Sequence, residues 1–162
     1  MSHSFRIGSI GCGAGIAARH RKGWAQCDRA RISAVCDQDR ERAEEVASDC
    51  GAACYSDINE MLEEEDLDAV DITTPDFLHA EHAEAVARRG LHVLCTKPLA
   101  VSHEGIERVR RAARETGVTV LPAMCNRWRP RYVTARRAIE EGRIGRPVFG
   151  QYVYRGTSYA YS

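Results

Sequence analysis

The sequence predicts an α/β fold in which a doubly wound parallel sheet lies between two layers of helices. From residue 5 to about residue 124, short apolar runs alternate with longer charged stretches. Strands separated by helices of roughly ten to fifteen residues are typical of right-handed βαβ units, which place helices on both faces of a parallel sheet. Hydrophobic residues make up 44% of the 162-residue chain, enough for one such core. We therefore expect a three-layer domain over residues 1–124 and a short appended helix and strand over residues 125–162.

Six short apolar runs are expected to form the strands. The first run ends in glycines, as a buried strand that leads into a tight turn does, and the third is the weakest of the set. No internal repeat interrupts the series. In chain order, the expected strands are residues 5–10, 32–36, 53–55, 69–72, 92–95 and 118–124.

The stretches between these runs carry signals for the starts and ends of helices. Asp57 stands three residues before a glutamate, the spacing of a capping box, and Asp76 and Ser102 are N-cap residue types. Gly90 and Gly117 stand where two helices end. The expected helices are residues 16–26, about 40–49, a short helix that reaches residue 64, residues 76–89, and the stretch between Ser102 and Gly117.

The composition changes after residue 124. Arginine-rich residues 130–141 predict one more helix, and the alternating residues 147–154 predict one more strand. One helix and one strand cannot bury a core of their own. We expect this tail to pack on the first domain, to pair with another chain as a homo-oligomer or with a partner subunit through its strand, or to be disordered.

Charge and cysteine content narrow the class of protein. The net charge is zero, with 23 basic and 23 acidic residues, which argues against a nucleic-acid or membrane-surface partner attracted by bulk charge. No apolar run has membrane-spanning length, and residues 1–6 lack a signal-peptide core. Seven cysteines, several inside apolar runs, indicate free thiols in a reducing cytoplasm, and Cys50 and Cys54 lack the further ligands of a zinc site.

A glycine-rich loop separates the first strand from the first helix. Gly11, Gly13 and Gly15 precede Ile16, where the first helix is expected to begin. Glycines in such a loop allow a tight turn and let backbone N–H groups approach a pyrophosphate, which the positive end of the helix also attracts. The sequence thus predicts a dinucleotide-binding Rossmann loop, with a simple strand–helix turn as the alternative.

The glycine fingerprint admits two alignments. In the first, Gly11 and Gly13 form the leading pair, and one residue is inserted before Ala17. In the second, Gly13, Gly15 and Ala18 form a regular G-x-G-x-x-A pattern. We prefer the first alignment because Gly11 adjoins the end of the strand.

An acidic residue follows the second strand at the spacing that dinucleotide sites use. Asp37 stands about 20 residues beyond the loop, where a carboxylate accepts hydrogen bonds from the adenosine ribose, and Gln38 follows it. Asp39 fits the role of helix cap, which leaves Asp37 available. A carboxylate here repels a 2′-phosphate and favours NAD over NADP, although Arg40 can still recruit a phosphate. A methyltransferase is the other class with a loop and acid of this kind, but such enzymes usually carry an acidic residue just before the glycines.

Three further segments follow the fourth, fifth and sixth expected strands. With Gly11-Cys12-Gly13, they resemble the motifs of the glucose–fructose oxidoreductase, inositol dehydrogenase and rhizopine-catabolism family (Gfo/Idh/MocA) in order and spacing, from about residue 5 onward. The resemblance implies hydride transfer between a nicotinamide cofactor and a secondary alcohol of a sugar or polyol. Carboxyl ends of parallel strands meet at one edge, so all the motifs point to one crevice. The segments are Thr73-Thr74-Pro75-Asp76-Phe77-Leu78-His79, Thr96-Lys97-Pro98-Leu99 and Asn126-Arg127-Trp128-Arg129-Pro130.

The first of these segments departs from the family pattern at one position. The family motif reads Thr-Pro-Asn with a histidine three residues further on, and here Asp76 replaces the asparagine. The resemblance implies that the matching residues line the cofactor pocket, although a strand-end turn with a helix cap explains the same pattern. The residues so implied are Thr73, Thr74, Pro75 and His79.

The other two segments carry the residues nearest the expected chemistry. The family reads Glu-Lys-Pro where this chain has Thr96, Lys97 and Pro98. In the family the lysine lies beside the nicotinamide and the substrate hydroxyl, where its amine orients the alcohol and helps proton transfer, so the resemblance makes Lys97 the catalytic candidate. Because Thr96 replaces the glutamate, that amine loses a carboxylate partner. Asn126 and Arg127 match a polar pair that the family places near the cofactor.

The family's second domain supplies a catalytic histidine near an aspartate. This sequence has no histidine after His103 and no aspartate after Asp76, so we expect residues 125–162 to be a truncated start of that domain. Three hypotheses follow. The chain is a dehydrogenase that needs a partner chain or is a truncated product, a non-catalytic NAD(H)-binding sensor or regulatory module, or an interaction protein that adds its last strand to another sheet.

Overall fold

A single parallel sheet organises the first part of the chain. The computed structural model describes residues 4–153 and divides them into two compact units that meet between Ala123 and Met124. The first unit holds a six-stranded sheet in the order β3-β2-β1-β4-β5-β6, and every pair is parallel. This confirms the predicted doubly wound α/β fold. The strands are β1 (Phe5–Ile10), β2 (Ala30–Cys36), β3 (Ala53–Tyr55), β4 (Ala69–Ile72), β5 (His92–Cys95) and β6 (Val120–Pro122).

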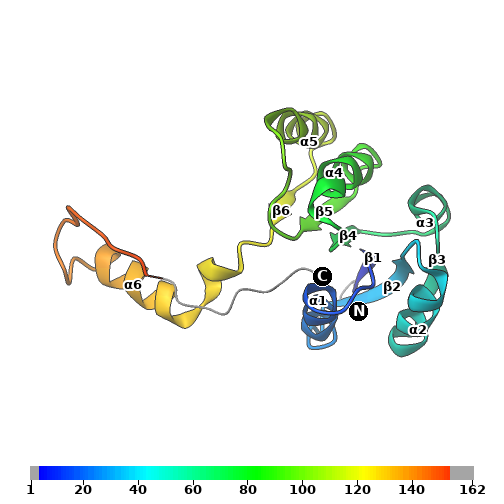
Figure 1. Ribbon diagram of the computed structural model, residues 1–162, viewed down its shortest axis with the longest axis horizontal. Helices are drawn as coiled ribbons and strands as arrows, with labels where there is room; N and C mark the ends of the chain where they lie inside the picture. The colour runs from blue at the N-terminus through cyan, green and yellow to red at the C-terminus, as the bar shows by residue number, and fades with distance from the viewer. Residues whose placement is uncertain (1–3, 154–162) are drawn as a thin grey trace. The chain divides into compact units, whose positions relative to one another are not determined.

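Helices cover both faces of this sheet (Figure 1). One core packs Ala43, Val46 and Ala47 against Ile32 and Val35 on the face that α1 and α2 cover. The larger core packs α3, α4 and α5 against the opposite face, which confirms three layers. The helices of this unit are α1 (Ile16–Trp24), α2 (Arg40–Cys50), α3 (Ile58–Glu64), α4 (His79–Arg88) and α5 (His103–Thr116), with the 3₁₀ turn η1 (Asp76–Leu78) before α4.

The switch point of the sheet lies between β1 and β4. The chain leaves β1 toward β2 and β3, returns to β4 on the other side of β1, and continues outward to β6. Loops after β1 and β4 therefore diverge at the carboxyl ends of these strands, and in open α/β sheets the crevice that binds ligands lies at this point.

The cap residues show where local sequence determined the structure and where it did not. Asp39, Asp57 and Ser102 accept hydrogen bonds from first-turn N–H groups of α2, α3 and α5. The expectation that Asp76 caps a helix starting there is wrong. Asp76 begins η1, which Leu78 N closes on Pro75 O at 2.9 Å, so backbone atoms make the turn and α4 starts only at His79 without a side-chain cap.

The second unit contains the 3₁₀ turn η2 (Cys125–Trp128) and α6 (Pro130–Glu140), which confirms the predicted last helix. The expected strand over residues 147–154 is wrong for residues 147–153, and Tyr154 lies outside the described residues. Val148 and Phe149 are 94% and 84% exposed. A strand needs a neighbouring strand to pair its backbone and a surface to cover, and the described part of the chain provides neither here. The Tyr132 and Tyr152 hydroxyls lie 2.6 Å apart within this unit.

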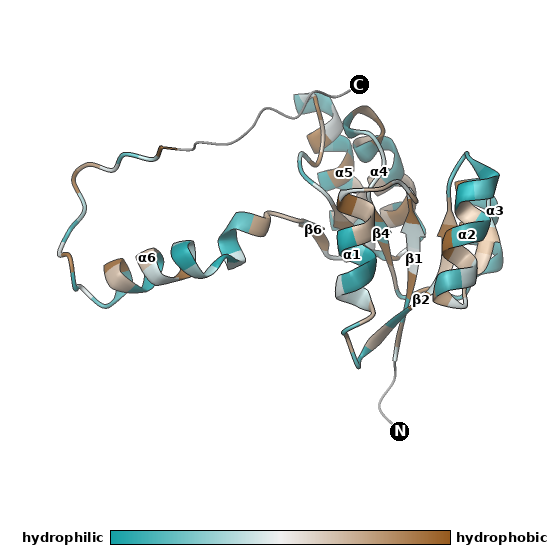
Figure 2. Ribbon diagram, turned by 60° about the horizontal axis from the view of Figure 1, so that its bottom comes forward, coloured by the Kyte–Doolittle hydropathy of each residue, from teal (hydrophilic) through white to brown (hydrophobic). Residues whose placement is uncertain are grey.

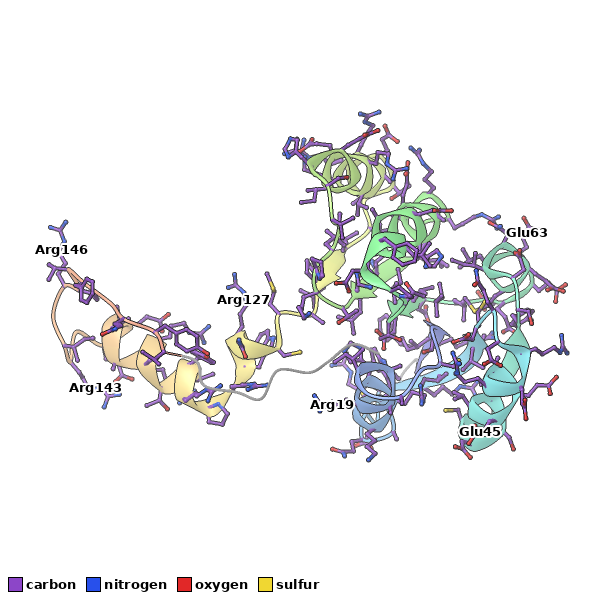
Figure 3. The ribbon with its side chains drawn as sticks, viewed as in Figure 1. Arg19, Glu45, Glu63, Arg127, Arg143 and Arg146 are labelled. Atoms are coloured by element: carbon purple, nitrogen blue, oxygen red, sulfur yellow. The ribbon has the colours of Figure 1, made fainter. Side chains whose placement is uncertain are left out.

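The surface of the second unit is strongly charged. None of the residues of α6 is buried, and Figure 2 shows apolar and polar segments mixed along this helix. Arg127, Arg143 and Arg146 project from the unit in Figure 3.

Among the described residues, no helix is long and apolar enough to span a membrane.

Candidate functional site: the edge of the sheet at the β1–β4 switch point

Gly11 is the point of closest backbone approach in the glycine loop. Its φ is +92°, a left-handed conformation that side chains rarely adopt, and a Cβ there would lie 2.9 Å from both Thr73 C and Thr74 N. Its N–H donates to Cys36 O at 2.9 Å. The loop thus passes between the ends of β2 and β4 through a gap that only glycine fits. This geometry supports the alignment in which Gly11 is the first glycine of the fingerprint.

Gly13 and Gly15 have a different environment. A Cβ built on either glycine meets no atom within 4 Å, so open space lies over this part of the loop. Gly15 is the N-cap of α1, no side chain caps the helix, and no acidic residue occupies its first turn. The first N–H groups of a helix lack intrahelical acceptors and attract anions. The loop and the start of α1, at Ile16, therefore fit a diphosphate.

Asp37 lies directly against the glycine loop. Its Oδ2 accepts a hydrogen bond from Cys12 N at 2.7 Å, and its Oδ1 accepts one from Asp39 N at 2.9 Å. The side chain is 12% exposed, whereas the next residue, Gln38, is exposed. Each carboxylate oxygen has two lone pairs, so Asp37 can also accept from ribose hydroxyls. The structure therefore brings the loop and the acid to one crevice.

An arginine that sequence reasoning missed lies beside this carboxylate. Arg42 Nη2 is 2.8 Å from Asp39 Oδ2, and its Nη1 is 3.5 Å from Asp37 Oδ1. Arg40, the arginine expected to recruit a 2′-phosphate, is instead paired with Glu44 at 2.8 Å. The signal was present in the sequence, because a basic residue three positions after a helix-capping aspartate returns to the same end of the helix.

The loop after β4 is tied to the glycine loop through Thr73. Its hydroxyl donates to Gly11 O at 2.8 Å, with Ile10 O at 3.2 Å, and its N–H donates to Ile10 O at 2.9 Å. Thr74 is half-buried, with its hydroxyl 3.2 Å from His82 Nδ1, and Pro75 is exposed at the rim. Thr73 thus holds the two loops together, while the next two residues border the crevice.

The loop after β5 presents Lys97. Thr96 is buried and continues the sheet, because its N–H donates to Ile72 O at 2.9 Å. Lys97 is exposed, and within residues 4–153 its amine has no ion-pair partner. The Lys97–Pro98 peptide bond is cis. An ammonium at the edge of the sheet that has no ion-pair partner in the described part of the chain is available to a ligand.

One expected site residue lies behind this rim, and two belong to the second unit. The ring of His79 is fully buried behind the loops, where its two nitrogens face backbone carbonyl oxygens. Asn126 and Arg127 belong to η2 in the second unit and are exposed. The structure groups the other expected residues at the carboxyl ends of β1, β2, β4 and β5.

A buried polar cluster fixes α1 beneath the glycine loop, and sequence reasoning missed it. Asp71 is 1% exposed, its Oδ2 accepts from Trp24 Nε1 at 2.7 Å, and its Oδ1 lies 2.9 Å from His20 Nδ1. The hydrogen bond with Asp71 raises the pKa of His20 above its ordinary value. The signal in the sequence was an aspartate inside an otherwise apolar strand.

The seven cysteines, all within the described residues, form no disulfide bond with one another, as the sequence predicted. Burial raises the pKa of the Cys12 thiol to about 11 and those of Cys36 and Cys95 to about 12. These thiols remain protonated at neutral pH and are poor nucleophiles. No group of three metal-ligating side chains occurs in the part of the chain that the structure describes.

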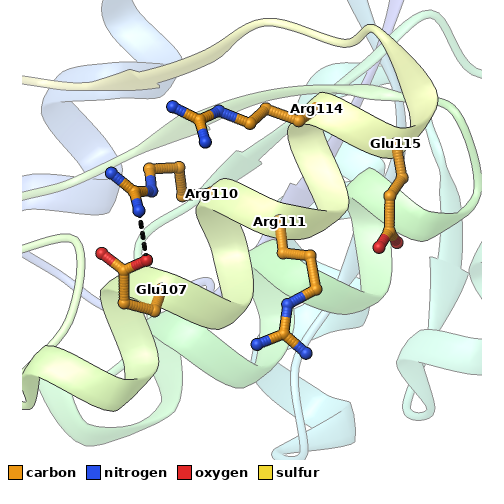
Figure 4. Close-up of a pocket in the computed structure, with 5 residues that line it drawn as sticks. All are labelled: Glu107, Arg110, Arg111, Arg114 and Glu115. Atoms are coloured by element: carbon orange, nitrogen blue, oxygen red, sulfur yellow. Dashed lines mark hydrogen bonds and ion pairs between the residues drawn. The ribbon is translucent and has the colours of Figure 1, made fainter.

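A shallow hollow on α5 does not form part of the site. Its lining comes from one exposed face of this helix, and Figure 4 shows arginine and glutamate side chains with an ion pair between Glu107 and Arg110. A charged face of this kind is typical of a solvated helix surface.

Comparisons with known proteins agree with this geometry. Residues 5–124 match the sequence model of the Gfo/Idh/MocA proteins, described as "Oxidoreductase family, NAD-binding Rossmann fold". Inositol 2-dehydrogenase 2 of Saccharopolyspora erythraea is 35% identical over 158 residues, which cover 96% of this chain and 47% of that protein. D-xylose 1-dehydrogenase (NADP(+)) 2 of Haloferax volcanii is 36% identical over 118 residues, which cover 72% of this chain and 36% of that protein.

A solved structure of a dehydrogenase is also similar to this chain. The WlbA dehydrogenase from Bordetella pertussis, in complex with NADH and UDP-GlcNAcA, matches with a TM-score of 0.85 and 34% identity, over 90% of this chain and 42% of that one. The chain spans less than half the length of each of these proteins.

Proposed function

Because the chain belongs to the Gfo/Idh/MocA family of NAD-binding oxidoreductases, we propose that its β1–β4 crevice binds a nicotinamide dinucleotide for hydride transfer to or from a secondary alcohol. The contact between Asp37 and Cys12 N carries this proposal, since it joins the ribose-binding acid to the diphosphate-binding loop. Sugars and polyols are the proposed substrate class, supported by the names of the similar enzymes.

Each end of the dinucleotide has residues suited to it. The N–H groups from Gly13 to the start of α1 would hold the diphosphate, and Asp37 would accept from the adenosine ribose. Thr74, Pro75 and Lys97 would border the nicotinamide. The bound nicotinamide supplies hydride chemistry, and the Lys97 amine would orient the reacting alcohol and help to move its proton.

Catalysis needs more than these residues. Among residues 104–162 there is no histidine or aspartate to serve as the acid–base pair of the family. We propose that residues 125–162 begin the second domain and that turnover requires the rest of such a domain or a partner chain. The exposed apolar residues of segment 147–153 support contact with further polypeptide, either a second copy or a partner subunit.

We propose a cytoplasmic location, which the absence of disulfide bonds among the seven cysteines supports.

Titration of NAD and NADP into the purified chain tests the proposal. We expect both to bind, NAD more tightly, because Asp37 repels a 2′-phosphate. In any preparation that reduces NAD with a polyol, Lys97→Ala should lower kcat by about 100-fold or more, the effect of losing a proton-transfer group. The variant should still bind NAD, because the glycine loop and Asp37 are unchanged. Failure of the chain to bind either dinucleotide would refute the proposal.

Replacing Arg42 by glutamine should change the choice between the two dinucleotides. Arg42 lies at the carboxylates of Asp37 and Asp39, so its guanidinium is placed to bind a 2′-phosphate. We expect Arg42→Gln to weaken NADP binding about tenfold and NAD binding less than twofold, as measured by calorimetry. Arg40→Gln is the matched control, because Arg40 pairs with Glu44 instead. An equal effect of the two substitutions on NADP would contradict this assignment.

A further inference from the structure

The loops after β4 and β5 lose their backbone connection at the point where they border the crevice. Ile72 and Cys95 are the last paired residues of β4 and β5, and the Thr96 N–H to Ile72 O bond is the last of the ladder. Within residues 4–153, no backbone hydrogen bond joins residues 74–75 to residues 97–98. The spacing between the two loops therefore depends on side chains.

His79 joins these loops from behind. Its Nε2 is 2.7 Å from Thr74 O, and its Nδ1 is 2.5 Å from Pro98 O. The ring is fully buried at the first turn of α4. A neutral imidazole carries one N–H and an imidazolium carries two, so the ring donates at least one hydrogen bond to these carbonyl oxygens. One side chain thus contacts the loop that carries Thr74 and the residue next to Lys97.

Close packing makes the start of α4 a firm support for this contact. A Cβ on Gly105, in the first turn of α5, would lie 2.9 Å from Ala80 Cβ and 3.1 Å from Ala100 Cβ. The residue after His79 and the chain that follows Pro98 therefore both pack closely against Gly105 of α5. This packing limits movement of the start of α4.

We propose that His79 is a positioning residue, which sets the distance between the Thr74 loop and Lys97 and does not touch the dinucleotide. This rests on the proposed function, because the two loops matter as a pair only if they hold the nicotinamide half of the cofactor. The resemblance implied that His79 lines the cofactor pocket, and its buried ring supports a role behind the pocket instead. Displacements of about 1 Å in such supports are enough to impair a site.

Comparing the binding of NAD with that of ADP-ribose distinguishes this positioning role from a general effect on folding. ADP-ribose carries the adenosine and diphosphate but not the nicotinamide. We expect His79→Leu to weaken NAD binding at least about fivefold while ADP-ribose binding stays within twofold, so the ratio of the two affinities falls. His79→Gln keeps an amide donor and should recover part of the ratio. Calorimetric titration of the purified chain with each ligand measures all of these values.

His82 provides the matched control. It lies on the same helix and its Nδ1 is 3.2 Å from the Thr74 hydroxyl, but it does not join the two loops. We expect His82→Leu to leave the affinity ratio within twofold of the wild type. Equal weakening of NAD and ADP-ribose in His79→Leu would mean a merely structural role and would overturn the proposal, as would an unchanged ratio.

The wild-type chain gives an independent test that does not require a folded variant. In NMR spectra, a ring N–H of His79 should be protected from solvent exchange with and without NAD, because a buried ring donates to a carbonyl. A ring that exchanges freely, or whose signals show direct contact with NAD, would overturn the proposal. If the wild type binds neither ligand, the proposed function is wrong and the role of His79 falls with it. If it binds both equally, only the role of His79 fails.

Discussion

Replacing Gly11 by alanine should lower the free energy of unfolding by about 3 kcal/mol and remove NAD binding. The backbone there has a φ of +92°, and the new Cβ would lie 2.9 Å from the backbone of Thr73 and Thr74. Neither neighbour can give way easily, because Thr73 is bonded to the loop through both its hydroxyl and its N–H. Denaturant unfolding followed by circular dichroism, together with NAD titration, measures both effects.

Gly13→Ala should affect NAD binding without the loss of stability expected for Gly11→Ala. Gly13 is not in the left-handed region, and a Cβ there meets no atom within 4 Å, so stability should change by less than about 0.5 kcal/mol. NAD binding should still weaken about tenfold, because the methyl group enters the space where the diphosphate would lie. Equal stability losses for Gly11→Ala and Gly13→Ala would contradict the close approach at Gly11. Unchanged NAD affinity in Gly13→Ala would place the diphosphate elsewhere.

Removing the carboxylate of Asp71 should destabilise the fold about as much as Gly11→Ala does. We expect Asp71→Ala to lower the free energy of unfolding by about 3 kcal/mol, because it leaves the half-buried N–H groups of His20 and Trp24 without their partner. NAD affinity should also fall, since α1 carries the N–H groups of the diphosphate site. Asp68→Ala is a less suitable comparison because Asp68 N–H and carboxylate both bond to Arg6 backbone atoms. Asp66→Ala is the better control, because its side chain is 96% exposed.

The same cluster predicts a pH dependence. Because Asp71 raises the pKa of folded His20, the protonated ring stabilises the folded state. This contribution is fully present below about pH 6.5, the ordinary pKa of an unfolded histidine, and is lost as the pH rises through the raised pKa. The difference in unfolding free energy between wild type and His20→Gln should therefore shrink with rising pH. A difference that stays constant or grows with rising pH would contradict this assignment.

Elements that depend on local chemistry were predicted well. The caps at Asp39, Asp57 and Ser102 need only a side-chain oxygen and the N–H groups of the next turn. The expected cap at Asp76 failed because the preceding Pro75 starts a backbone-bonded turn. The expected strand after residue 146 failed because alternation describes a strand's faces but not whether a neighbour exists to pair with it.

The contacts of the candidate site also divide into those that the sequence predicted and those that it could not. The meeting of the glycine loop and Asp37 was predictable because parallel strands bring their carboxyl ends to one edge. The bond between His20 and Asp71 joins residues 51 positions apart, and only their shared placement across the sheet creates it. Sequence spacing could not assign the two carbonyl contacts of His79 either, because both partners are backbone atoms, which carry no sequence signal.

The two N–H groups that bond to the Asp37 carboxylate affect the affinity with which a nucleotide can bind. The carboxylate already has a fixed rotamer, so its torsional freedom is lost during folding and not during ligand capture. Preorganisation of this kind lowers the entropic cost of association. The adenosine side of a dinucleotide would therefore meet a carboxylate that needs no rearrangement, whereas the exposed Lys97 side chain would lose torsional freedom on binding.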